Sequence, residues 1–275
     1  SPQLAAYYDR HALLQGDRML GWEGTGRPRV LRSGVVQVGV SRDAWLALDS
    51  AGALWRWAAD PARATRLREG VARFAAGASG WIAIDRDGSA WQASTDDRPQ
   101  RVMTDVVDAC VGDSADYLVT RDGRLHVKGL AHRGQYGDGF LRATEHYVAT
   151  ATDAVAVRAH TGHAIHLRRD GVVMGTGGNR YGPLSSHGLG DKADRWGPLF
   201  EGATAIATGS RHSLALRADG SLWAWGEGFA ITPARVMERV RAVAAGDTVT
   251  LALAADGTLW QWNAGRGPER VALPG

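Results

Sequence analysis

A β-hairpin pattern that returns along the whole chain limits what this sequence can fold into. Its clearest copy lies at residues 205–226, where alternating apolar residues stand on both sides of an Asp-Gly pair. Asp-Gly between two such runs predicts a tight hairpin, and we expect a type I′ turn in which both central residues have positive φ. The turn signals are Gly16-Asp17, Ala51-Gly52, Asp87-Gly88, Asp122-Gly123, Asp170-Gly171, Asp219-Gly220 and Asp256-Gly257. The chain therefore contains seven copies of one hairpin.

Each hairpin belongs to a unit of about four short strands. The second turn residues are 35, 36, 35, 48, 49 and 37 positions apart. An apolar strand and a small residue precede the hairpins, with His160 as the exception at the small position, and another strand follows. Repeats of this length are typical of propeller blades. We predict an all-β fold, a single seven-bladed β-propeller domain over residues 1–275, with turn centres near 17, 52, 88, 123, 171, 220 and 257.

The chain ends indicate that the array closes into a ring. Eighteen residues follow Gly257 and the first turn residue is position 17, so joining the ends restores the spacing of 35. An open solenoid gains nothing from this phasing, whereas a ring leaves no sheet edge. We expect the N-terminal strand around residues 4–8 to complete the last blade, so that the N- and C-terminal strands share one blade.

The repeat resembles that of the regulator of chromosome condensation family. The resemblance is carried by Gly209-Ser210-Arg211-His212-Ser213, by Asp219-Gly220-Ser221-Leu222-Trp223, and by the glycine-rich segments 134–139 and 178–182. It implies a propeller fold, and for the eukaryotic relatives it implies regulation of a small GTPase or binding to chromatin. Most of the blades are shorter than in the chromatin-bound members. In size and blade length the chain is similar to propeller-type bacterial β-lactamase inhibitor proteins, which occupy a target enzyme.

Composition and charge favour a protein partner over other classes. The net charge is +3, nearly all positive charge is arginine, and no run of five or six like charges occurs, so nucleic acid is disfavoured. No apolar stretch is long enough to span a membrane. Cys110 is the only cysteine, which excludes an intramolecular disulfide and predicts a small buried side chain. The chain starts at Ser1 without methionine, which leaves the compartment open and favours a secreted or periplasmic location over the cytoplasm.

Several residues look chemical but favour structural roles. His160, His163 and His166 alternate in direction on a strand, so they do not predict a metal site. Asp138 and Asp191 lie in glycine-rich loops without the spacing of a calcium loop. No P-loop, nucleophile elbow or dinucleotide fingerprint occurs. We therefore expect no metal, no cofactor and no enzymatic activity.

Two insertions predict where a partner binds. The fourth and fifth units carry extra residues at about 130–147 and 177–196, on the face opposite the Asp-Gly turns. Aromatic and arginine side chains there are typical of interfaces, although they serve equally to pack the loops onto their own blades. The insertions also carry His132, and short loops on the same face add Arg42, Asp43, Ser114 and Thr248 around the opening. The candidate partner-binding residues are Arg133, Tyr136, Phe140, Tyr147, Arg180, Tyr181, Arg195, Trp196, Arg211, His212, Asp113 and Asp247.

The preferred hypothesis is a monomeric bacterial protein-binding propeller, an inhibitor or immunity-type protein that covers a partner enzyme or toxin. The resemblance leaves a second hypothesis, a regulator of a small GTPase or a chromatin-type binder. A third is a propeller enzyme that acts on carbohydrate around the central opening, which convergent carboxylates near the axis would indicate.

Overall fold

The computed structural model describes residues 3–78, 80–94, 97–131, 133–140, 142–185 and 190–275. Blades 1 to 4 consist of β1 (Leu4–Tyr7), β2 (Arg10–Gln15), β3 (Arg18–Glu23) and β4 (Arg29–Arg32); β5 (Val35–Val40), β6 (Trp45–Asp49), β7 (Leu54–Trp57) and β8 (Thr65–Arg68); β9 (Val71–Gly77), β10 (Gly80–Asp85), β11 (Ala90–Ala93) and β12 (Gln100–Met103); and β13 (Val106–Val111), β14 (Ala115–Thr120), β15 (Leu125–Ala131) and β16 (Arg142–Ala151). Blades 5 to 7 consist of β17 (Ala154–Ala159), β18 (His163–Arg168), β19 (Val173–Gly178) and β20 (Lys192–Phe200); β21 (Ala203–Thr208), β22 (His212–Arg217), β23 (Leu222–Gly226) and β24 (Ala234–Met237); and β25 (Val240–Gly246), β26 (Val249–Ala254), β27 (Leu259–Asn263) and β28 (Glu269–Val271).

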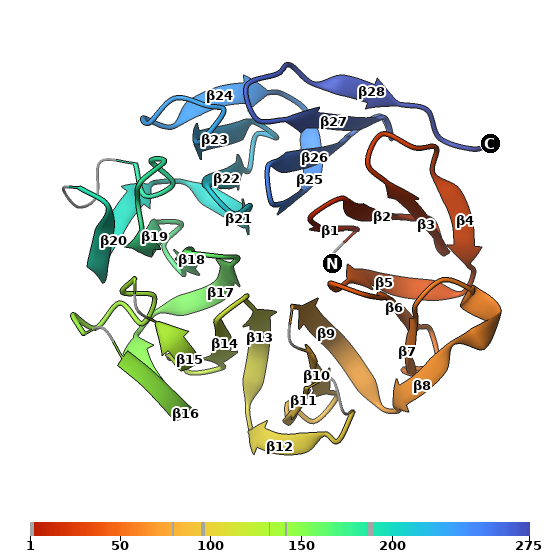
Figure 1. Cartoon of the computed structure of the whole chain (residues 1–275), viewed down its shortest axis with the longest axis horizontal. Helices are drawn as coiled ribbons and strands as arrows, with labels where there is room; N and C mark the ends of the chain where they lie inside the picture. Colours follow the sequence, from red (N-terminus) through yellow and green to blue (C-terminus); the bar gives the residue numbers. More distant parts are fainter. Residues whose placement is uncertain (1–2, 79, 95–96, 132, 141, 186–189) are drawn as a thin grey trace.

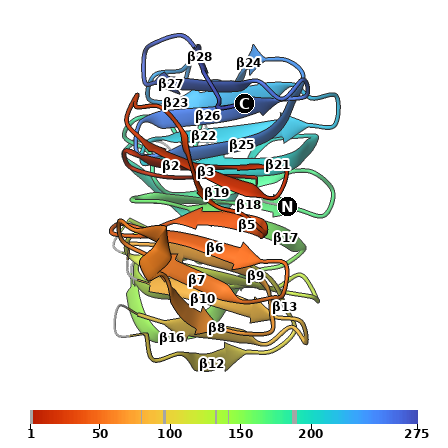
Figure 2. The ribbon, with the colours of Figure 1, turned by 90° about the vertical axis from the view of Figure 1, so that its right-hand side faces the viewer.

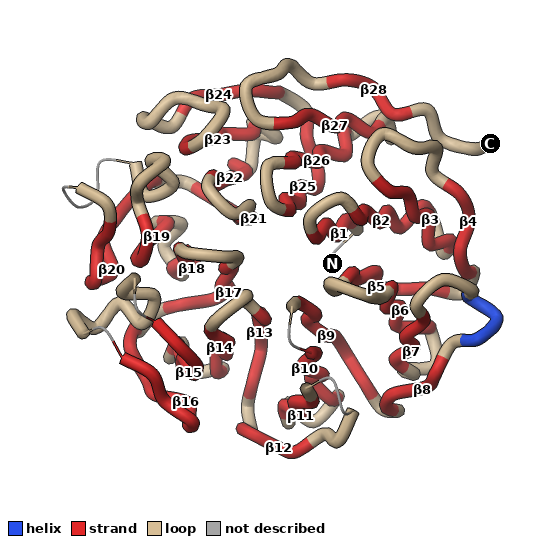
Figure 3. The backbone as a smooth tube through the Cα atoms, in the orientation of Figure 1, coloured by secondary structure: helices blue, strands red, loops and turns tan. Residues whose placement is uncertain are grey.

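These strands form seven antiparallel four-stranded sheets around a central opening, which confirms the predicted all-β seven-bladed propeller (Figure 1). Within each sheet the strands follow one another in chain order. The first strand of every blade lies nearest the axis and the fourth lies on the rim (Figure 1). Among the described residues, the one helical turn is the 3-10 helix η1 (Pro61–Arg63), on the rim between β7 and β8 (Figure 3).

The hairpins occur where the sequence predicts them, but their turns are not of type I′. In blade 3, the amide of Gly88 donates to the carbonyl of Asp85 and the amide of Asp85 donates to the carbonyl of Ser89, both at 2.9 Å. Gly88 has a φ of 87°, whereas Asp87 is not among the residues with positive φ. This is a type I turn followed by a glycine bulge, which needs positive φ at one residue only. The Asp87 side chain accepts from the amide of Ser89 at 2.9 Å, which explains the aspartate.

The hydrophobic core is divided among the contacts between neighbouring blades. Each of the clusters of buried residues joins two adjacent sheets, as where Leu46 and Leu54 of blade 2 meet Phe74 and Trp81 of blade 3. Burial of one such side chain contributes about 1.5–3 kcal/mol, so the ring is stabilised at every interface and not by one central core. A cavity lined by the first strands of the blades lies along the axis.

The ring is closed, but the prediction that the N- and C-terminal strands share one blade is wrong. β1 pairs with β2 in the first blade and β28 pairs with β27 in the last, so the terminal strands do not share a sheet. Blades 1 and 7 instead meet face to face, as Figure 2 shows for β2 and β3 beside β25 and β26. Leu13 and Leu20 of blade 1 pack against Leu251 of blade 7. The spacing of 35 is the same wherever the ring is cut, so it could not reveal that the cut falls between two blades.

A buried glutamine joins the two blades at this seam. Nε1 of Trp22 donates to Oε1 of Gln261 at 2.9 Å, and Nε2 of Gln261 donates to the carbonyl of Gly24 at the same distance. Trp22 is 0% exposed and Gln261 is 7% exposed, so both bonds are shielded from water. Apolar packing and these two hydrogen bonds therefore take the place of a shared strand.

Candidate functional site

The loops of each blade leave the ring on two opposite faces. The Asp-Gly turns join the second and third strands and form one face, called here the turn face. The other loops join the first strand to the second and the third to the fourth, and form the insertion face. Its longest loops join β15 to β16 in blade 4 and β19 to β20 in blade 5. The two predicted insertions therefore lie on one face.

Part of each insertion lengthens a rim strand, β16 in blade 4 and β20 in blade 5, and the rest forms a loop. β16 has ten residues and β20 has nine, whereas β8, β12 and β24 have four each. The blade 4 loop contacts the extended rim strand of blade 5, because Asp138 forms an isolated antiparallel bridge with Arg195 of β20. The two insertions are therefore in contact across the boundary between blades 4 and 5.

Two of the predicted contact residues are core residues. Tyr136 is 0% exposed, and its hydroxyl donates to the carbonyl of Gly129 at 2.6 Å. His212 is 1% exposed, with Nε2 at 3.0 Å from Oγ1 of Thr250 in the next blade. Both side chains complete the contacts between neighbouring strands and have no surface to offer a partner. The prediction that Tyr136 and His212 contact a partner is therefore wrong.

Two further predicted residues are half-buried and pack on their own part of the ring. The Trp196 ring lies edge-on to His166 with centroids 4.7 Å apart. The Tyr147 hydroxyl donates to Oε1 of Gln92 at 2.7 Å, and Nζ of Lys128 lies 4.9 Å from the Tyr147 ring centroid. These contacts favour the structural alternative for Trp196 and Tyr147.

The remaining aromatic residues of the insertions are exposed, and one of them is held between arginines. Tyr181 is 38% exposed, and Cζ of Arg211 lies 4.2 Å from its ring centroid while Cζ of Arg180 lies 5.9 Å away. Nη1 of Arg211 also lies 3.5 Å from Oε1 of Glu227. Ile231 is 63% exposed and lies against Gly182, the residue that follows Tyr181, since a Cβ on Gly182 would be 3.2 Å from Cγ1 of Ile231. We call Arg180, Tyr181, Arg211 and Ile231 the Tyr181 patch.

Other predicted residues surround this patch without joining it. Phe140 is 63% exposed at the tip of the blade 4 loop, and Arg133 is exposed near its start. The Arg195 side chain lies over the backbone of Gly139, where a Cβ would be 2.7 Å from Nη2. His132 lies outside the described residues.

A second cluster, called here the mouth cluster, closes the axis on the insertion face. The Tyr7 hydroxyl of blade 1 donates to Oδ1 of Asp113 of blade 4 at 3.0 Å, and the Tyr8 hydroxyl donates to Oδ2 at 3.3 Å. Oγ1 of Thr161 in blade 5 donates to the same Oδ2 at 3.3 Å and to Oγ of Ser210 in blade 6 at 3.1 Å. The mouth cluster consists of Tyr7, Tyr8, Asp113, His160, Thr161, Ser210 and Asp247.

The His160 ring sits in the middle of the mouth cluster. It stacks on Tyr7 with centroids 5.5 Å apart, and its Nδ1 lies 2.9 Å from Oγ1 of Thr161. Its Nε2 accepts from the amide of Asp247 at 3.4 Å, so the neutral ring with its proton on Nδ1 satisfies both contacts. Burial lowers the pKa of His160, which keeps the ring neutral. Burial and Asp113 together raise the pKa of Tyr7.

The backbone at the mouth cluster is strained. Tyr8 has a φ of 52° and Asp247 a φ of 48°, values that residues with a side chain rarely adopt. The sequence predicted that Asp113 and Asp247 lie near the axis, but it missed the two tyrosines, His160, Thr161 and Ser210. The one available signal was that His160 breaks the repeat at a position where the other units carry a small residue.

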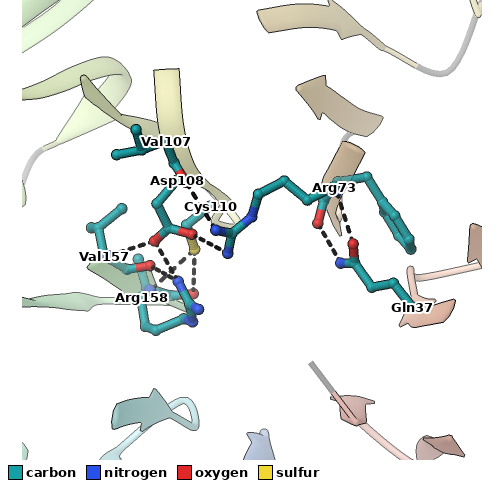
Figure 4. A network of polar contacts seen from close by, with 9 residues as sticks. Gln37, Arg73, Val107, Asp108, Cys110, Val157 and Arg158 are labelled. Carbon is teal, nitrogen blue, oxygen red and sulfur yellow. Dashed lines mark hydrogen bonds and ion pairs between the residues drawn. The ribbon is translucent and has the colours of Figure 1, made fainter. Parts of the chain in front are cut away.

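Below the mouth cluster, polar side chains of the inner strands join neighbouring blades. Asp108 of β13 accepts from the amide of Val157 in β17 at 2.9 Å, and Gln37 of β5 bonds the amide and carbonyl of Phe74 in β9 (Figure 4). The amide of Ala159 donates to Sγ of Cys110 at 3.2 Å. Burial raises the pKa of the Cys110 thiol to about 12, so it is a poor nucleophile, as the sequence predicts.

The described residues contain no group of three or more histidine, cysteine or acidic side chains that could hold a metal ion. Within the same residues, no helix is long and apolar enough to cross a membrane.

Comparison with known proteins agrees with the fold and with the repeat. A family model for the Regulator of chromosome condensation (RCC1) repeat matches residues 203–229, which span β21 to β23 of blade 6. The chain carries an RCC1-type repeat. Among curated proteins, the ultraviolet-B receptor UVR8 of Arabidopsis thaliana is 26% identical over 122 residues. That match covers 40% of this chain and 27% of UVR8, so it spans about a quarter of the curated relative.

Solved structures resemble this propeller over most of its length. Prp20p of Saccharomyces cerevisiae matches with a TM-score of 0.74 and 16% identity, over 89% of this chain and 80% of that chain. Human WBSCR16 matches with a TM-score of 0.78 and 15% identity, over 90% of this chain and 85% of that chain. Identities this low show a shared fold and carry no function with them.

Proposed function

We propose that this RCC1-type chain is a non-catalytic propeller that binds a partner protein through its insertion face. The observation that carries the proposal is the Tyr181 patch, where two arginines lie near an exposed aromatic ring and an isoleucine that is 63% exposed lies against the next residue, Gly182. Tyrosine and arginine are enriched among the residues that dominate binding energy, and an exposed apolar neighbour adds area that water does not favour. Loops on a rigid ring are the common place for such a surface.

The geometry of the patch also lowers the cost of binding. Arg211 is held by the Tyr181 ring on one side and by Glu227 on the other. A side chain that is already ordered loses less conformational entropy when a partner covers it. Phe140, which is 63% exposed on the neighbouring blade, extends the apolar surface along the same face.

We further propose that the partner is an enzyme or toxin, which the propeller covers and inhibits. This part rests on the similarity in size and blade length to bacterial β-lactamase inhibitor proteins. Its test is direct: the captured partner loses its activity when the propeller is added in equal amount. A partner that stays fully active in the complex contradicts the inhibitory role and leaves the binding role intact.

Affinity purification from the source organism tests the binding face. The variants Tyr181→Ala, Arg211→Ala and Ile231→Ala should each reduce the captured partner about tenfold, because truncation of an interface anchor costs 1 kcal/mol or more. Their melting temperatures should match that of the unmodified chain, because all three side chains are exposed.

Two controls on other surfaces match these variants. Arg124→Ala removes an exposed arginine that lies 3.5 Å from Asp122 on the turn face, as Arg211 lies from Glu227. Val30→Ala shortens an apolar side chain that is 45% exposed on the rim. Both controls should capture the partner normally. Equal capture by all five variants would refute the assignment of the face.

The similarity to Prp20p favours a second candidate. The structure of that protein was described together with its binding to Gsp1p and histones. A role of this kind predicts that the chain accelerates nucleotide release from a small GTPase or is retained on histones. Release at the intrinsic rate and no retention would remove this candidate.

A further inference from the structure

A channel runs along the axis of the ring. Its cavity has a volume of about 700 Å³, and its walls are the first strands of the blades, from β1 to β25 (Figure 1). Most of the lining side chains are alanine, valine or other apolar residues. Toward the insertion face the cavity ends at Tyr7, Asp113 and His160, and the Tyr7–Asp113 bond crosses the axis from blade 1 to blade 4. A ligand therefore enters from the turn face.

The charged groups of the channel wall present positive charge to the cavity. Nη2 of Arg73 lies 2.9 Å from Oδ1 of Asp108, and Nη1 of Arg158 lies 2.8 Å from Oδ2 (Figure 4). The Asp108 side chain is 4% exposed, whereas those of Arg73 and Arg158 are 41% and 34% exposed. The carboxylate is thus covered by two guanidinium groups, and it balances the charge of one of them.

A third arginine stands at the entrance. Arg241 is the second residue of β25 and lines the cavity at the turn face, where its side chain is exposed. Within the described part of the chain, Arg241 makes no ion pair. The cavity lining thus contains three arginines and one buried aspartate, Asp108, while Asp113 at the far end is already bonded to Tyr7 and Thr161.

We propose that the channel binds a small organic anion, a carboxylate or phosphate group on an apolar body. The oxyanion lies among Arg73, Arg158 and Arg241, whose planar guanidinium groups suit two-point bonds to an oxyanion. The apolar body lies against the alanine and valine wall toward the mouth cluster. The volume falls within the range of roughly 300–1,000 Å³ that small-molecule sites occupy. This site lies on the axis and does not depend on the proposed protein-binding face.

Calorimetric titration at constant ionic strength tests the site with defined probes. 2-Naphthoate should bind saturably at one site per chain, and neutral 2-naphthamide, which has the same shape, should not bind. Arg241→Ala should weaken the binding of naphthoate roughly tenfold, because it removes one charge-assisted hydrogen bond. Arg266→Ala, an exposed arginine between β27 and β28, is the matched control and should bind as the unmodified chain does.

Equal binding of naphthoate and naphthamide, or equal affinities of Arg241→Ala and Arg266→Ala, would overturn the proposal. Inorganic phosphate carries an oxyanion but no apolar body, so it tests the contribution of the apolar wall. It should bind more weakly than naphthoate, and equal binding would refute the role of that wall.

Discussion

Acid should unfold this propeller at a pH at which most of its carboxylates are still ionised. Four histidines, His11, His163, His166 and His212, lie inside the blades with 0–1% of their surface exposed. Burial lowers the pKa of each. The pKa is lowered to about 3 for His163 and to about 4 for His11, His166 and His212. In the unfolded chain the same rings take up a proton near pH 6.5.

The sign follows from this difference. Above pH 6.5 the four rings are mostly neutral in both the folded and the unfolded state, so they add little pH dependence to the free energy of unfolding. Between pH 6.5 and about 4 the unfolded chain binds protons that the folded chain excludes, so the free energy of unfolding falls as the pH falls. From pH 7 to pH 5 each ring contributes a loss of about 2 kcal/mol, and the four together about 7 kcal/mol. A domain has about 5–15 kcal/mol in total, so the transition should lie near pH 5.

Urea unfolding followed by tryptophan fluorescence, at half-unit steps from pH 8 to pH 5, measures this slope. His163→Gln should reduce this slope, because one proton-excluding site is gone while the other buried histidines, His160 among them, keep theirs. His146→Gln is the control, since His146 is exposed and should leave the slope unchanged. A free energy of unfolding that stays level down to pH 5, or equal slopes for the two variants, would show that the buried rings are protonated in the folded state.

Two further predictions concern single contacts. Gln261→Leu leaves the buried Nε1 of Trp22 without an acceptor at the seam between blades 7 and 1. It should lower the free energy of unfolding by about 1–3 kcal/mol. The control Gln100→Leu, on the rim, should change the urea midpoint little. The same midpoint for both would mean that the seam is held by apolar packing alone. Burial raises the pKa of Asp116 to about 6, so its carboxylate costs stability as the pH rises through 4 to 6. Asp116→Asn should therefore be more stable than the unmodified chain at pH 7.5, by up to about 3 kcal/mol, and should unfold at a higher temperature. This advantage should shrink at pH 5, and an advantage independent of pH would contradict the assignment.

The number of blades could be predicted because each blade repeats a local signal. The Asp-Gly turns recur at a spacing that only changes where blades 4 and 5 are longer, and every turn lies between the second and third strands. The closure could not be predicted in the same way. A periodic sequence has the same spacing for every cut of the ring, and the place of the cut depends on whether β1 pairs with β2 or with a strand of blade 7.

The candidate site could be predicted as a region but not residue by residue. Tyr136 and Tyr181 both lie in glycine-rich loops of the insertions, yet the first is 0% and the second 38% exposed. The difference arises because the Tyr136 loop turns back onto its own blade, where the carbonyl of Gly129 accepts its hydroxyl. Residue type is the same in both cases, so only the path of the backbone separates a core residue from a surface one.

The mouth cluster shows why the two proposed sites are compatible in one small ring. Tyr7 and Asp113 are 106 positions apart in sequence and meet across the axis, so the channel is closed on the side where the Tyr181 patch lies. A protein seated on the insertion face therefore covers the closed end, and an anion that enters from the turn face reaches Arg241 without passing that protein. The two sites share no side chain, because the patch is built from rim and loop residues and the channel from inner strands. The mouth cluster lies between the two sites, since its Ser210 directly precedes Arg211 of the Tyr181 patch while its Tyr7, Asp113 and His160 line the cavity.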